Sequence, residues 1–499
     1  MFDHAVLHRV RGSISGLGKG TLVSSLAILL RDIGLKLTAI KVDPYLNFDA
    51  GTISPFEHGE VFVLKDGCET DLDLGNYERA LNIELSSSNC ITTGKIFSTV
   101  FNAERKGSYL GKTVQMVPHV TDCIQEMFSQ LAESEECYDV CLVEIGGTVG
   151  DIESSLYLEA IQQFVHRRGA DNVSLCHLVF VPTVSAEQKT KCAQHSFRAL
   201  RESGLFPSFI FARSTDPLTQ QSLSKLSTFS GVSQERIFSC YDVSNLYFYH
   251  SSNDTYISVV KAVEHASFRL NIPIKLVNIS AELLEKDADP KQAEEVYETL
   301  CSCHAVLIPG GFGERGTAGM IKAIWHARTH DIPILGICLG MQLMCIEAAQ
   351  NVLGYSNANS EEFGATDPDN FIMFLPDSSR EIYGGTMRLG EHATSILSET
   401  SLAYEIYKRK TVHERHRHRF EFNKLYENLF ADAGFVFSGI DVSNQRYEII
   451  ERPGHAFFFG TQFHPEYKSS LENPSEVFLA FAAASQRSKQ KADAKRQII

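Results

Sequence analysis

A cysteine and a histidine–glutamate pair have the residue types and the local spacing of a thiol-based catalytic triad. Residues 333–342 read P-I-L-G-I-C-L-G-M-Q, with Cys338 between two glycines after an apolar run. The G-x-C-x-G spacing predicts a sharp strand-to-helix turn that exposes the thiol, and a helix N-terminus favours the thiolate. The later H-P-E sequence supplies His464 as a base and Glu466 as the group that orients its ring. A buried structural cysteine is the alternative, and the flanking glycines argue against it.

Two further segments of the second half have a bearing on this chemistry. P-G-G-F-G at 309–313 follows the apolar run Ala305–Ile308, and its backbone N–H groups fit the needs of an oxyanion hole. The run E-R-H-R-H-R-F-E at 414–421 is unusually cationic for this acidic chain. It reads either as a plain surface patch or as a contact for an anion or a partner.

A glycine-rich segment near the chain start predicts a phosphate-binding loop. Residues 12–21 read G-S-I-S-G-L-G-K-G-T and precede the helical pattern Leu22–Leu30. Backbone N–H groups of such a turn surround phosphates, the helix dipole adds attraction, and Lys19 would reach the β- and γ-phosphates. The strict pattern is not matched, because Ser13 replaces its first glycine and Gly20 its Ser or Thr. The alternative is a simple tight turn.

Acidic residues in the first half have the character of magnesium ligands. Asp71 and Asp73 lie in E-T-D-L-D-L-G-N-Y-E-R, and Glu144 ends an apolar run. Mg²⁺ prefers a few carboxylates together with phosphate oxygens. A helix cap or a solvated surface group is the alternative for each acid taken singly. Lys189 and Lys191 follow another apolar run and would either bind a second set of phosphates or face solvent.

Short apolar runs alternate with longer helical patterns along the whole chain. This alternation predicts two α/β domains that are doubly wound and built on mostly parallel sheets. The domain boundary falls in Tyr241–Asp254, a junction with little linker character before the helix expected over Tyr256–Leu270. We expect domains over residues 1–250 and 251–484, with a polar tail over 485–499. The expected buried strands are Leu37–Val42, Val140–Ile145, His177–Val181, Phe209–Ala212, Ala305–Ile308 and Pro333–Ile337.

The composition limits the classes of protein to which the chain can belong. A chain of 499 residues with 43% hydrophobic and 21% charged residues predicts a multidomain globular protein. The formal net charge of -15 argues against a nucleic-acid partner. Twelve cysteines without a C-x-x-C pair argue against a zinc knuckle or a disulfide framework, and so for a reducing compartment. With neither a signal pattern nor a long apolar stretch, we expect a cytoplasmic protein without a membrane partner.

Taken together and in this order, the motifs resemble the CTP synthase family over nearly the whole chain. The set in the second half indicates a class I glutamine amidotransferase, and the set in the first half separates CTP synthases from other users of that module. The matching stretches are S-G-L-G-K-G (15–20), I-K-V-D-P-Y-L-N (40–47), S-P-F-E-H-G-E-V-F-V (54–63), D-L-D-L-G-N-Y-E-R (71–79), T-T-G-K-I (92–96), E-R-K-G-S-Y-L-G-K-T-V-Q (104–115), P-H-V-T-D (118–122), P-G-G-F-G (309–313), C-L-G-M-Q (338–342), G-G-T-M-R-L-G (384–390), R-H-R-H-R-F-E (415–421) and H-P-E (464–466).

The resemblance implies a phosphate-loop synthase domain of the dethiobiotin-synthetase type followed by a class I amidotransferase domain. It also implies the chemistry. ATP phosphorylates O4 of the UTP uracil, while Cys338 attacks the side-chain amide of L-glutamine, forms a thioester and releases ammonia. The ammonia then displaces phosphate at C4 to give CTP. The family uses Mg²⁺ with ATP, GTP as an allosteric activator and CTP as a feedback inhibitor. It assembles as homotetramers whose interfaces complete the nucleotide sites, and filaments remain open for this chain.

By the same resemblance, each substrate is assigned a set of residues. ATP would meet Ser15, Gly16, Leu17, Gly18, Lys19, Gly20, Thr21, Lys41, Asp73, Tyr241, Asp242 and Val243. UTP or CTP would meet Ser15, Asp151, Ile152, Glu153, Lys189, Thr190, Lys191, Cys192, Ala193, Gln194 and Lys225. Glutamine would meet Gly311, Leu339, Gly340, Met341, Gln342, Glu362 and Arg419. The metal would be held by Asp73 and Glu144.

The chain departs from the family pattern at three places. Arg11 stands where the family has a glycine near the phosphate loop, and K-T-K-C-A-Q at 189–194 lacks a threonine hydroxyl. Only Phe248–Asn253 separates two segments that in the family are several dozen residues apart, so the amidotransferase domain is expected to lack its first strand. A lost strand would leave apolar faces uncovered and a sheet edge unpaired.

These departures leave several functions open. The first is a working, glutamine-dependent CTP synthase. The second is a synthase that uses free ammonia but couples glutamine poorly, because of the short junction. The third is a non-catalytic relative that co-assembles with an intact synthase, which Arg11 and the short junction would favour. A different ATP-dependent amidoligase is disfavoured, because the motifs expected to face the uracil match CTP synthase too closely.

Overall fold

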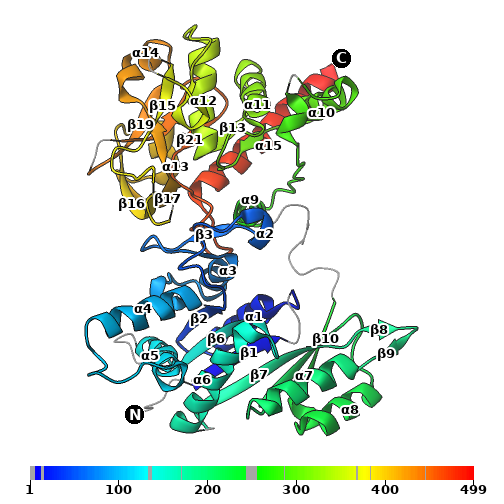
Figure 1. Cartoon of the computed structure of the whole chain (residues 1–499). Coiled ribbons are helices and arrows are strands. Elements are labelled where there is room, and N and C mark those ends of the chain that lie inside the picture. The colour runs from blue at the N-terminus through cyan, green and yellow to red at the C-terminus, as the bar shows by residue number, and fades with distance from the viewer. Residues whose placement is uncertain are drawn as a thin grey trace. The chain divides into compact units, whose positions relative to one another are not determined.

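A computed structural model describes residues 6–12, 16–132, 137–169, 171–242, 256–285, 287–366, 369–381, 384–443 and 446–498 of the chain. The chain divides into two compact units. The first contains Met1–Phe62 and Thr70–Asp254, and the second contains Val63–Glu69 and Thr255–Ile499. Each unit combines a seven-stranded sheet with helices, so the expected α/β class is confirmed for both (Figure 1).

The first unit is built on a wholly parallel sheet with the strand order β11-β10-β7-β1-β6-β2-β5. All seven residues of β2 are buried, as expected for a central strand of such a sheet. The four strands that the apolar runs predict in this half are all present. The strands are β1 (Val6–Gly12), β2 (Leu37–Asp43), β5 (Cys90–Thr92), β6 (Val140–Thr148), β7 (Val173–Phe180), β10 (Phe209–Ser214) and β11 (Ile237–Tyr241), with a small hairpin of β8 (Thr183–Val184) and β9 (Glu187–Gln188).

Helices connect the parallel strands of the first unit, as crossover connections require. A core cluster joins the β2, β5 and β6 region to α4, α5 and α6, where Phe128 and Phe164 meet edge to face. The helices are α1 (Lys19–Asp32), α2 (Pro55–His58), α3 (Leu72–Leu81), α4 (Thr93–Arg105), α5 (Thr121–Ala132), α6 (Ile152–Arg168), α7 (Lys191–Glu202) and α8 (Gln220–Ser230).

The second unit has a mixed sheet with the strand order β12-β13-β21-β20-β19-β16-β17. Only the β12–β13 and β13–β21 pairs are parallel, and the other four pairs are antiparallel. The expectation of a mostly parallel sheet therefore holds for the first unit but is wrong for the second. The short connections between β19, β20 and β21 explain the difference, because a parallel crossover needs about a dozen residues or more.

The elements of the second unit include both strands expected from its apolar runs and the helix expected over 256–270. The second unit also contains a separate three-stranded sheet, with the strand order β14 (Asn359–Ser360), β15 (Asn370–Phe374) and β18 (Phe420–Phe422). The main strands are β12 (Val306–Ile308), β13 (Ile334–Ile337), β16 (Arg388–Ile396), β17 (Thr411–His418), β19 (Val436–Asp441), β20 (Tyr447–Glu451) and β21 (Phe458–Thr461). The helices are α9 (Ile257–Leu270), α10 (Pro290–Ser302), α11 (Thr317–Thr329), α12 (Leu339–Asn351), α13 (Leu402–Tyr407), α14 (Glu427–Asp432) and α15 (Glu476–Ile498).

Strand β12 ends the sheet of the second unit. Among the described residues it pairs with β13 alone. Residues 272–280, which follow α9, form no strand, and Leu276 and Val277 are 46% and 43% exposed. An unpaired edge and uncovered apolar side chains are what a missing opening strand predicts. The junction Phe248–Asn253 itself lies outside the described residues.

A hairpin from the first half of the sequence belongs to the second unit. It joins β3 (Val61–Val63) to β4 (Glu69–Asp71). Arg415 Nη1 donates to the Val63 carbonyl over 3.1 Å, and Arg417 Nε lies 2.8 Å from Glu69 Oε1. The sequence-based domain over residues 1–250 does not anticipate this exchange.

The polar tail expected over 485–499 continues helix α15 as far as Ile498. Helix α15 buries Val477, Phe478, Phe481 and Ala484 against the core, and its described residues from Gln486 onward are largely exposed. All twelve cysteines are free, in agreement with the expectation of no disulfide framework. No described helix has both the length and the apolar character needed to cross a bilayer.

Candidate functional site

Cys338 lies on a strained turn between β13 and α12. Its φ of 53° and ψ of -104° are rare for a residue with a side chain, and such strain gathers at functional positions. Neighbouring atoms lie so close to positions 336 and 340 that only glycine fits there. A Cβ on Gly336 would lie 2.4 Å from Met344 Sδ, and one on Gly340 would lie 2.3 Å from the Ile308 carbonyl oxygen. The G-x-C-x-G motif therefore forms the turn that its spacing predicts.

The histidine–glutamate pair of the predicted triad is assembled next to this thiol. His464 Nδ1 lies 2.7 Å from Glu466 Oε1, and both side chains are buried. The imidazole stacks on Tyr467, with ring centroids 4.9 Å apart. Burial would lower the pKa of His464, but the Glu466 carboxylate and Cys338 outweigh it and raise this pKa to about 10. At neutral pH the ring is therefore a cation beside the sulfur, which favours the thiolate.

The P-G-G-F-G loop lies directly against this pair of groups. A Cβ on Gly310 would be 2.8 Å from His464 Cε1 and 3.5 Å from Cys338 Cβ. This approach brings backbone of the loop to the place where an oxyanion hole is expected. Two members of the predicted glutamine-binding set also meet here, because a Cβ on Gly311 would be 3.3 Å from Leu339 Cδ2.

Glu362 and Arg419 are two more members of the predicted glutamine-binding set. Glu362 Oε1 accepts a hydrogen bond from the Gly313 N–H over 2.7 Å. Burial raises the pKa of Glu362, while the Gly313 N–H and the Arg419 guanidinium oppose the rise. A neighbouring carboxylate and guanidinium are suited to the ammonium and carboxylate groups of an amino acid.

Gln462 also touches the reactive sulfur. Its Nε2 lies 3.6 Å from Cys338 Sγ, and its Oε1 lies 3.2 Å from Gln342 Nε2. Sequence reasoning missed this residue, although it stands two positions before His464. Of the remaining predicted residues, Met341 is buried in the core cluster, and Gln342 directs its amide to Gln462 and to the Phe420 carbonyl.

The cationic run at 414–421 is not a plain surface patch. Its first residues form β17, where His416 and His418 are buried and Arg415 is 1% exposed. The surface interpretation is therefore wrong, because the run pairs with β16 and its cations are used inside the second unit. Arg415 and Arg417 bind the hairpin of residues 63–69.

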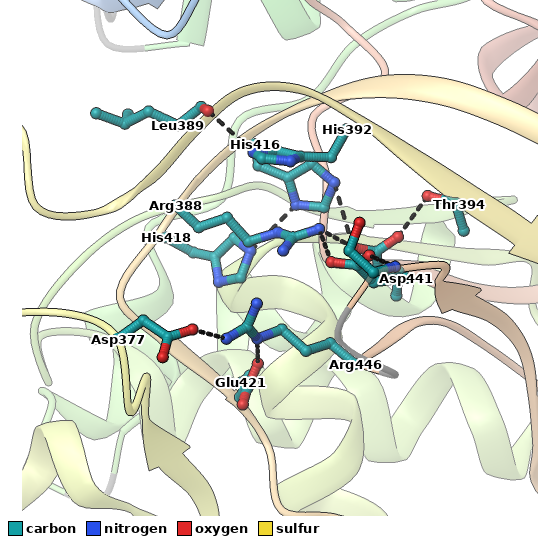
Figure 2. Close-up of polar contacts among 12 residues, drawn as sticks. Asp377, Arg388, Leu389, His392, Thr394, His416, His418, Glu421, Asp441 and Arg446 are labelled. Carbon is teal, nitrogen blue, oxygen red and sulfur yellow. Dashed lines mark hydrogen bonds and ion pairs between the residues drawn. The ribbon is translucent and has the colours of Figure 1, made fainter.

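A buried ionic network lies along β16, β17, β19 and β20, and Figure 2 shows its members pointing toward one another. Arg388 pairs with Asp441 and lies 2.8 Å from Glu448 Oε1. Burial raises the pKa of Glu448 to about 7 against the pull of Arg388. Burial, together with neighbouring positive charge, holds the pKa values of His416 and His418 well below the ordinary range. Both histidines are therefore neutral at physiological pH.

The phosphate loop borders a cavity of about 540 Å³ in the first unit. Gly16 and Gly18 have φ values of 69° and 95°, and α1 begins at Lys19, as the motif predicts. Ser15 lies outside the described residues. A Cβ on Gly20 would be only 2.3 Å from Asp73 Oδ1, which explains why a glycine replaces the serine or threonine of the strict pattern. The lining residues are Gly16–Thr21, Lys41, Asp43, Pro44, Tyr45, His58, Asp71, Asp73, Asn76, Glu144, Gly146, Gly147, Asp151 and Glu153.

Lys41 stands among carboxylates in this cavity. Its Nζ lies 2.8 Å from Asp43 Oδ1, 3.0 Å from Asp73 Oδ2 and 3.7 Å from Asp71 Oδ2. Burial would lower the pKa of Lys41, but Asp43 and Asp73 outweigh it and raise this pKa well above the ordinary value. Lys41 is therefore a permanent cation.

The acids of the cavity carry more negative charge than Lys41 balances. Burial and then repulsion from Asp73 raise the pKa of Glu144 to about 8, and Tyr77 donates a hydrogen bond to its carboxylate. Burial raises the pKa of Asp71 to about 6, and the buried Asp43 Oδ2 has no hydrogen-bond partner.

This donor set fits a divalent cation. The described residues contain no group of three acidic, cysteine or histidine side chains placed to hold a metal by themselves. Phosphate oxygens would supply the remaining ligands.

The structure leaves several predicted nucleotide residues outside this cavity. Asp151 and Glu153 line it, whereas the exposed Ile152, the segment Lys189–Gln194 and Lys225 do not. Lys189 pairs with Glu187, and Gln194 Nε2 bonds Thr190 Oγ1 over 2.9 Å. Tyr241 and Asp242 lie at the end of β11, and Val243 lies outside the described residues.

Arg213 is a further residue beside the loop that sequence reasoning missed. Its Nη1 would be 3.2 Å from a Cβ on Gly18, and its Nη2 lies 2.6 Å from Asp242 Oδ1. The available signal was its place near the carboxyl end of the predicted strand over 209–212, where ligands bind in parallel sheets.

Comparison with known proteins decides the family. Residues 9–257 match the model for the CTP synthase N-terminus, and residues 252–484 match the model for class I glutamine amidotransferases. The CTP synthase of Neurospora crassa is 40% identical over 95% of this chain and 94% of its own length. The chain belongs to the CTP synthase family. Human CTP synthase 1 is 41% identical over 95% of this chain and 91% of its length, and the Pyrococcus abyssi CTP synthase is 42% identical over 97% and 98%.

The alignments also show that this member of the CTP synthase family is shorter than these relatives. They run over 538–543 positions for these relatives, more than the 499 residues of the chain, so the relatives have residues with no counterpart here. Among solved structures, the glutaminase domain of Trypanosoma brucei CTPS with bound acivicin is 36% identical. It covers 48% of this chain and 90% of its own length, with a TM-score of 0.44.

Proposed function

We propose that the chain makes CTP from UTP, ATP and L-glutamine, with the two reactions divided between its two units. The observation that carries the proposal is the presence, in one member of the CTP synthase family, of two different chemical sites. One is the Cys338–His464–Glu466 constellation, and the other is the acid-lined cavity at the phosphate loop. Neither site alone accounts for an ATP-dependent amination that takes its nitrogen from glutamine.

The thiol site releases ammonia. The protonated His464 holds Cys338 as a thiolate, and the sulfur attacks the side-chain amide carbon of glutamine. Backbone N–H groups of the Gly310–Gly311 region receive the developing oxyanion, and His464 gives its proton to the departing ammonia. Water then cleaves the thioester. It gives a proton to the now neutral His464, its oxygen bonds to the carbonyl carbon, and the electron pair of the broken C–S bond returns to the sulfur as glutamate leaves. Glu362 and Arg419 orient the amino-acid end of glutamine, together with Gly311, Leu339, Gly340, Met341 and Gln342.

The phosphate-loop cavity activates UTP. Backbone N–H groups of residues 16–21 and the Lys19 ammonium bind the phosphates of ATP, while Lys41 stands where it can neutralise the transferring phosphoryl group. Asp73 and Glu144 would hold Mg²⁺, which supplies charge neutralisation for the phosphates when bound. Burial raises the pKa of Glu144 to about 8, so this carboxyl would have to ionise to hold the cation. Phosphorylation of uracil O4 creates the leaving group that ammonia displaces.

The uracil nucleotide site and the regulation belong to the same proposal. Asp151 and Glu153 line the cavity, while Lys189–Gln194 and Lys225 do not, which supports a site completed by another copy in a homotetramer. We assign UTP, and CTP as feedback inhibitor, to that shared site, and GTP to the role of activator. The cytoplasm supplies all of these nucleotides together with the reducing conditions that a free thiol needs.

A single assay tests this function. The purified chain is incubated with UTP, ATP and Mg²⁺ and either glutamine or ammonium chloride, and CTP is quantified by chromatography. We expect CTP from both nitrogen donors, with ATP hydrolysis matching CTP formation. Absence of CTP with both donors would contradict the proposal and favour a non-catalytic, co-assembling relative, the role that Arg11 motivates.

The unpaired edge at β12 and the exposed Leu276 and Val277 favour one second candidate. This is a synthase that uses free ammonia efficiently and glutamine poorly, because the sheet that carries Cys338 lacks a neighbouring strand. It predicts CTP formation from ammonia at rates at least about tenfold above those from saturating glutamine. Comparable rates with the two donors would eliminate it.

A further inference from the structure

A side-chain amide outside the triad reaches the reactive sulfur. Gln462 directly follows β21 and is 1% exposed. Its Nε2 lies 3.6 Å from Cys338 Sγ, a normal distance for a hydrogen bond to sulfur, and its own backbone N–H is held by the Glu448 carbonyl over 2.9 Å. The contact is buried, so water does not compete for it.

The direction of the Gln462 amide follows from the groups around it. Gln342 Nε2 lies 3.0 Å from the Phe420 carbonyl oxygen, which can only accept, so the NH₂ end of Gln342 must face it. The same NH₂ group lies 3.2 Å from the other amide, so that end of Gln462 must be the oxygen. Its NH₂ end is then the one that faces the sulfur. A flipped Gln462 would set two NH₂ groups against each other.

The Phe420 carbonyl, which accepts from Gln342, also contacts His418, one of the two buried histidines shown in Figure 2. His418 Nδ1 lies 2.8 Å from it and must donate, which leaves His418 Nε2 as an acceptor in the neutral ring. His416 Nδ1, 3.1 Å away, donates to that nitrogen. Because burial keeps both rings neutral, each ring has one N–H that donates and one nitrogen that accepts. The network therefore fixes the orientation of the amide at the sulfur.

The other groups around the sulfur oppose one another, and the His464 cation is the one that favours the thiolate. The Arg417 carbonyl oxygen, 3.6 Å from Sγ, can only accept and favours the S–H form, as does burial. The Gln462 N–H can only donate and favours the thiolate. We propose that Gln462 is a catalytic residue of the thiol site, whose side-chain amide donates a hydrogen bond to the Cys338 sulfur and holds it as the attacking thiolate. The proposal rests on the proposed function in one respect, that Cys338 is the nucleophile.

The same hydrogen bond acts at the end of the glutamine reaction. When water displaces the sulfur from the thioester, the C–S bond breaks and its electron pair goes to sulfur. The Gln462 amide is in place to receive that charge without rearrangement. A hydrogen bond to a charged acceptor is stronger than one between neutral groups, so its loss should be visible in the reactivity of the thiol.

The experiment reads the thiol directly in the full-length chain. Gln462→Met removes the donor at similar side-chain length, and Gln462→Glu places a carboxylate against the sulfur. Gln350→Met is the matched control, because Gln350 bonds the Ala358 carbonyl at the far end of α12. The rate of iodoacetamide alkylation is measured against pH, and the Cys338 peptide is quantified by mass spectrometry to separate it from the other cysteines.

We expect the midpoint of Cys338 alkylation to rise by about one pH unit in Gln462→Met and further in Gln462→Glu. It should stay unchanged in Gln350→Met. The kcat for glutamine hydrolysis should fall about tenfold in Gln462→Met while KM changes little. Gln462→Asn, which withdraws the same amide from the sulfur, gives a milder variant if the methionine disturbs folding. The melting temperature of each variant is measured alongside.

A wild-type alkylation midpoint in Gln462→Met and Gln462→Asn, with native melting temperatures, would overturn the proposal. So would a loss of glutaminase activity that appears only in KM. Failure of the proposed function gives a different signature. The wild-type chain would then make no CTP from either donor, while the alkylation midpoints still report whether Gln462 controls the thiol.

Discussion

The thiol site and the phosphate-loop cavity are prepared for chemistry in opposite ways. At the thiol site, the groups are already in contact: His464 lies 2.7 Å from Glu466, and Gln462 Nε2 lies 3.6 Å from the sulfur. At the phosphate loop, acids are crowded around Lys41, and the pKa of Glu144 is raised to about 8. The first arrangement is preorganised, whereas the second is an unbalanced charge distribution that becomes balanced only when ligands bind.

The two sites also differ in what stabilises the unit around each of them. Close packing around glycines and a buried ionic network stabilise the thiol site even when no substrate is bound. In the cavity, neighbouring carboxylates repel one another, and a bound cation would relieve this repulsion. Loss of a ligand should therefore weaken the first unit more than the second.

The largest expected effect separates the two sites by variant. Cys338→Ala should lower glutamine-dependent CTP synthesis by at least about 10³-fold and leave ammonia-dependent synthesis within about twofold. Lys41→Met should abolish both, because it acts where the two nitrogen sources converge. Both rates are measured by CTP chromatography.

The exposed Cys301, changed to Ala, serves as the control for a cysteine lost elsewhere. Equal losses with glutamine and ammonia in Cys338→Ala would mean that the two sites are not separable in this way.

An intermediate effect concerns pH and the cation. The pKa of Glu144 is raised from its ordinary value near 4.5 to about 8, so the folded chain binds more protons than the unfolded chain between these values. Stability therefore falls as pH rises through this window, and Asp71 contributes in the same direction up to about pH 6. Mg²⁺ with ATP should stabilise the ionised carboxylates. It should therefore raise the melting temperature by about 3–6 °C more at pH 8 than at pH 5.5. Differential scanning fluorimetry measures the shift.

Glu144→Gln removes this ionisation and should flatten the pH dependence of the shift. An equal Mg²⁺ and ATP shift at the two pH values in the unmodified chain would show that the acids do not form the cation site.

The smallest expected effect lies outside both sites. Removing residues 488–499 deletes the largely exposed end of α15 and should change the free energy of unfolding by less than about 1 kcal/mol. Both CTP synthesis rates should stay the same. Ending the chain after Val477 also removes Phe478 and Phe481, whose burial stabilises the second unit, and should lower the melting temperature clearly. Thermal melts of the two truncations test this contrast.

Sequence reasoning was most successful where one segment contains its own signal. The turn at Cys338 and the loop at Gly16–Lys19 depend on local spacing of glycines, and the buried strands depend on unbroken apolar runs. Gln462 and Arg213 were missed because their partners are distant in the sequence. The cationic run of β17 was misjudged because charged residues are normally exposed. Nothing in the run reveals the distant Val63 carbonyl and Glu69 carboxylate that Arg415 and Arg417 contact. The antiparallel pairs of the second sheet depend on connection lengths between strands whose neighbours were unknown.

The hairpin of residues 63–69 bears on how such a protein could be divided or could have arisen by fusion. The polypeptide passes from one unit to the other three times rather than once. Split into two genes at the junction near residue 250, the downstream product would lack the Val63 carbonyl that Arg415 binds and the Glu69 carboxylate that Arg417 binds. The two halves are therefore not interchangeable cassettes. A downstream product made alone is therefore expected to need residues 63–69 of the upstream one.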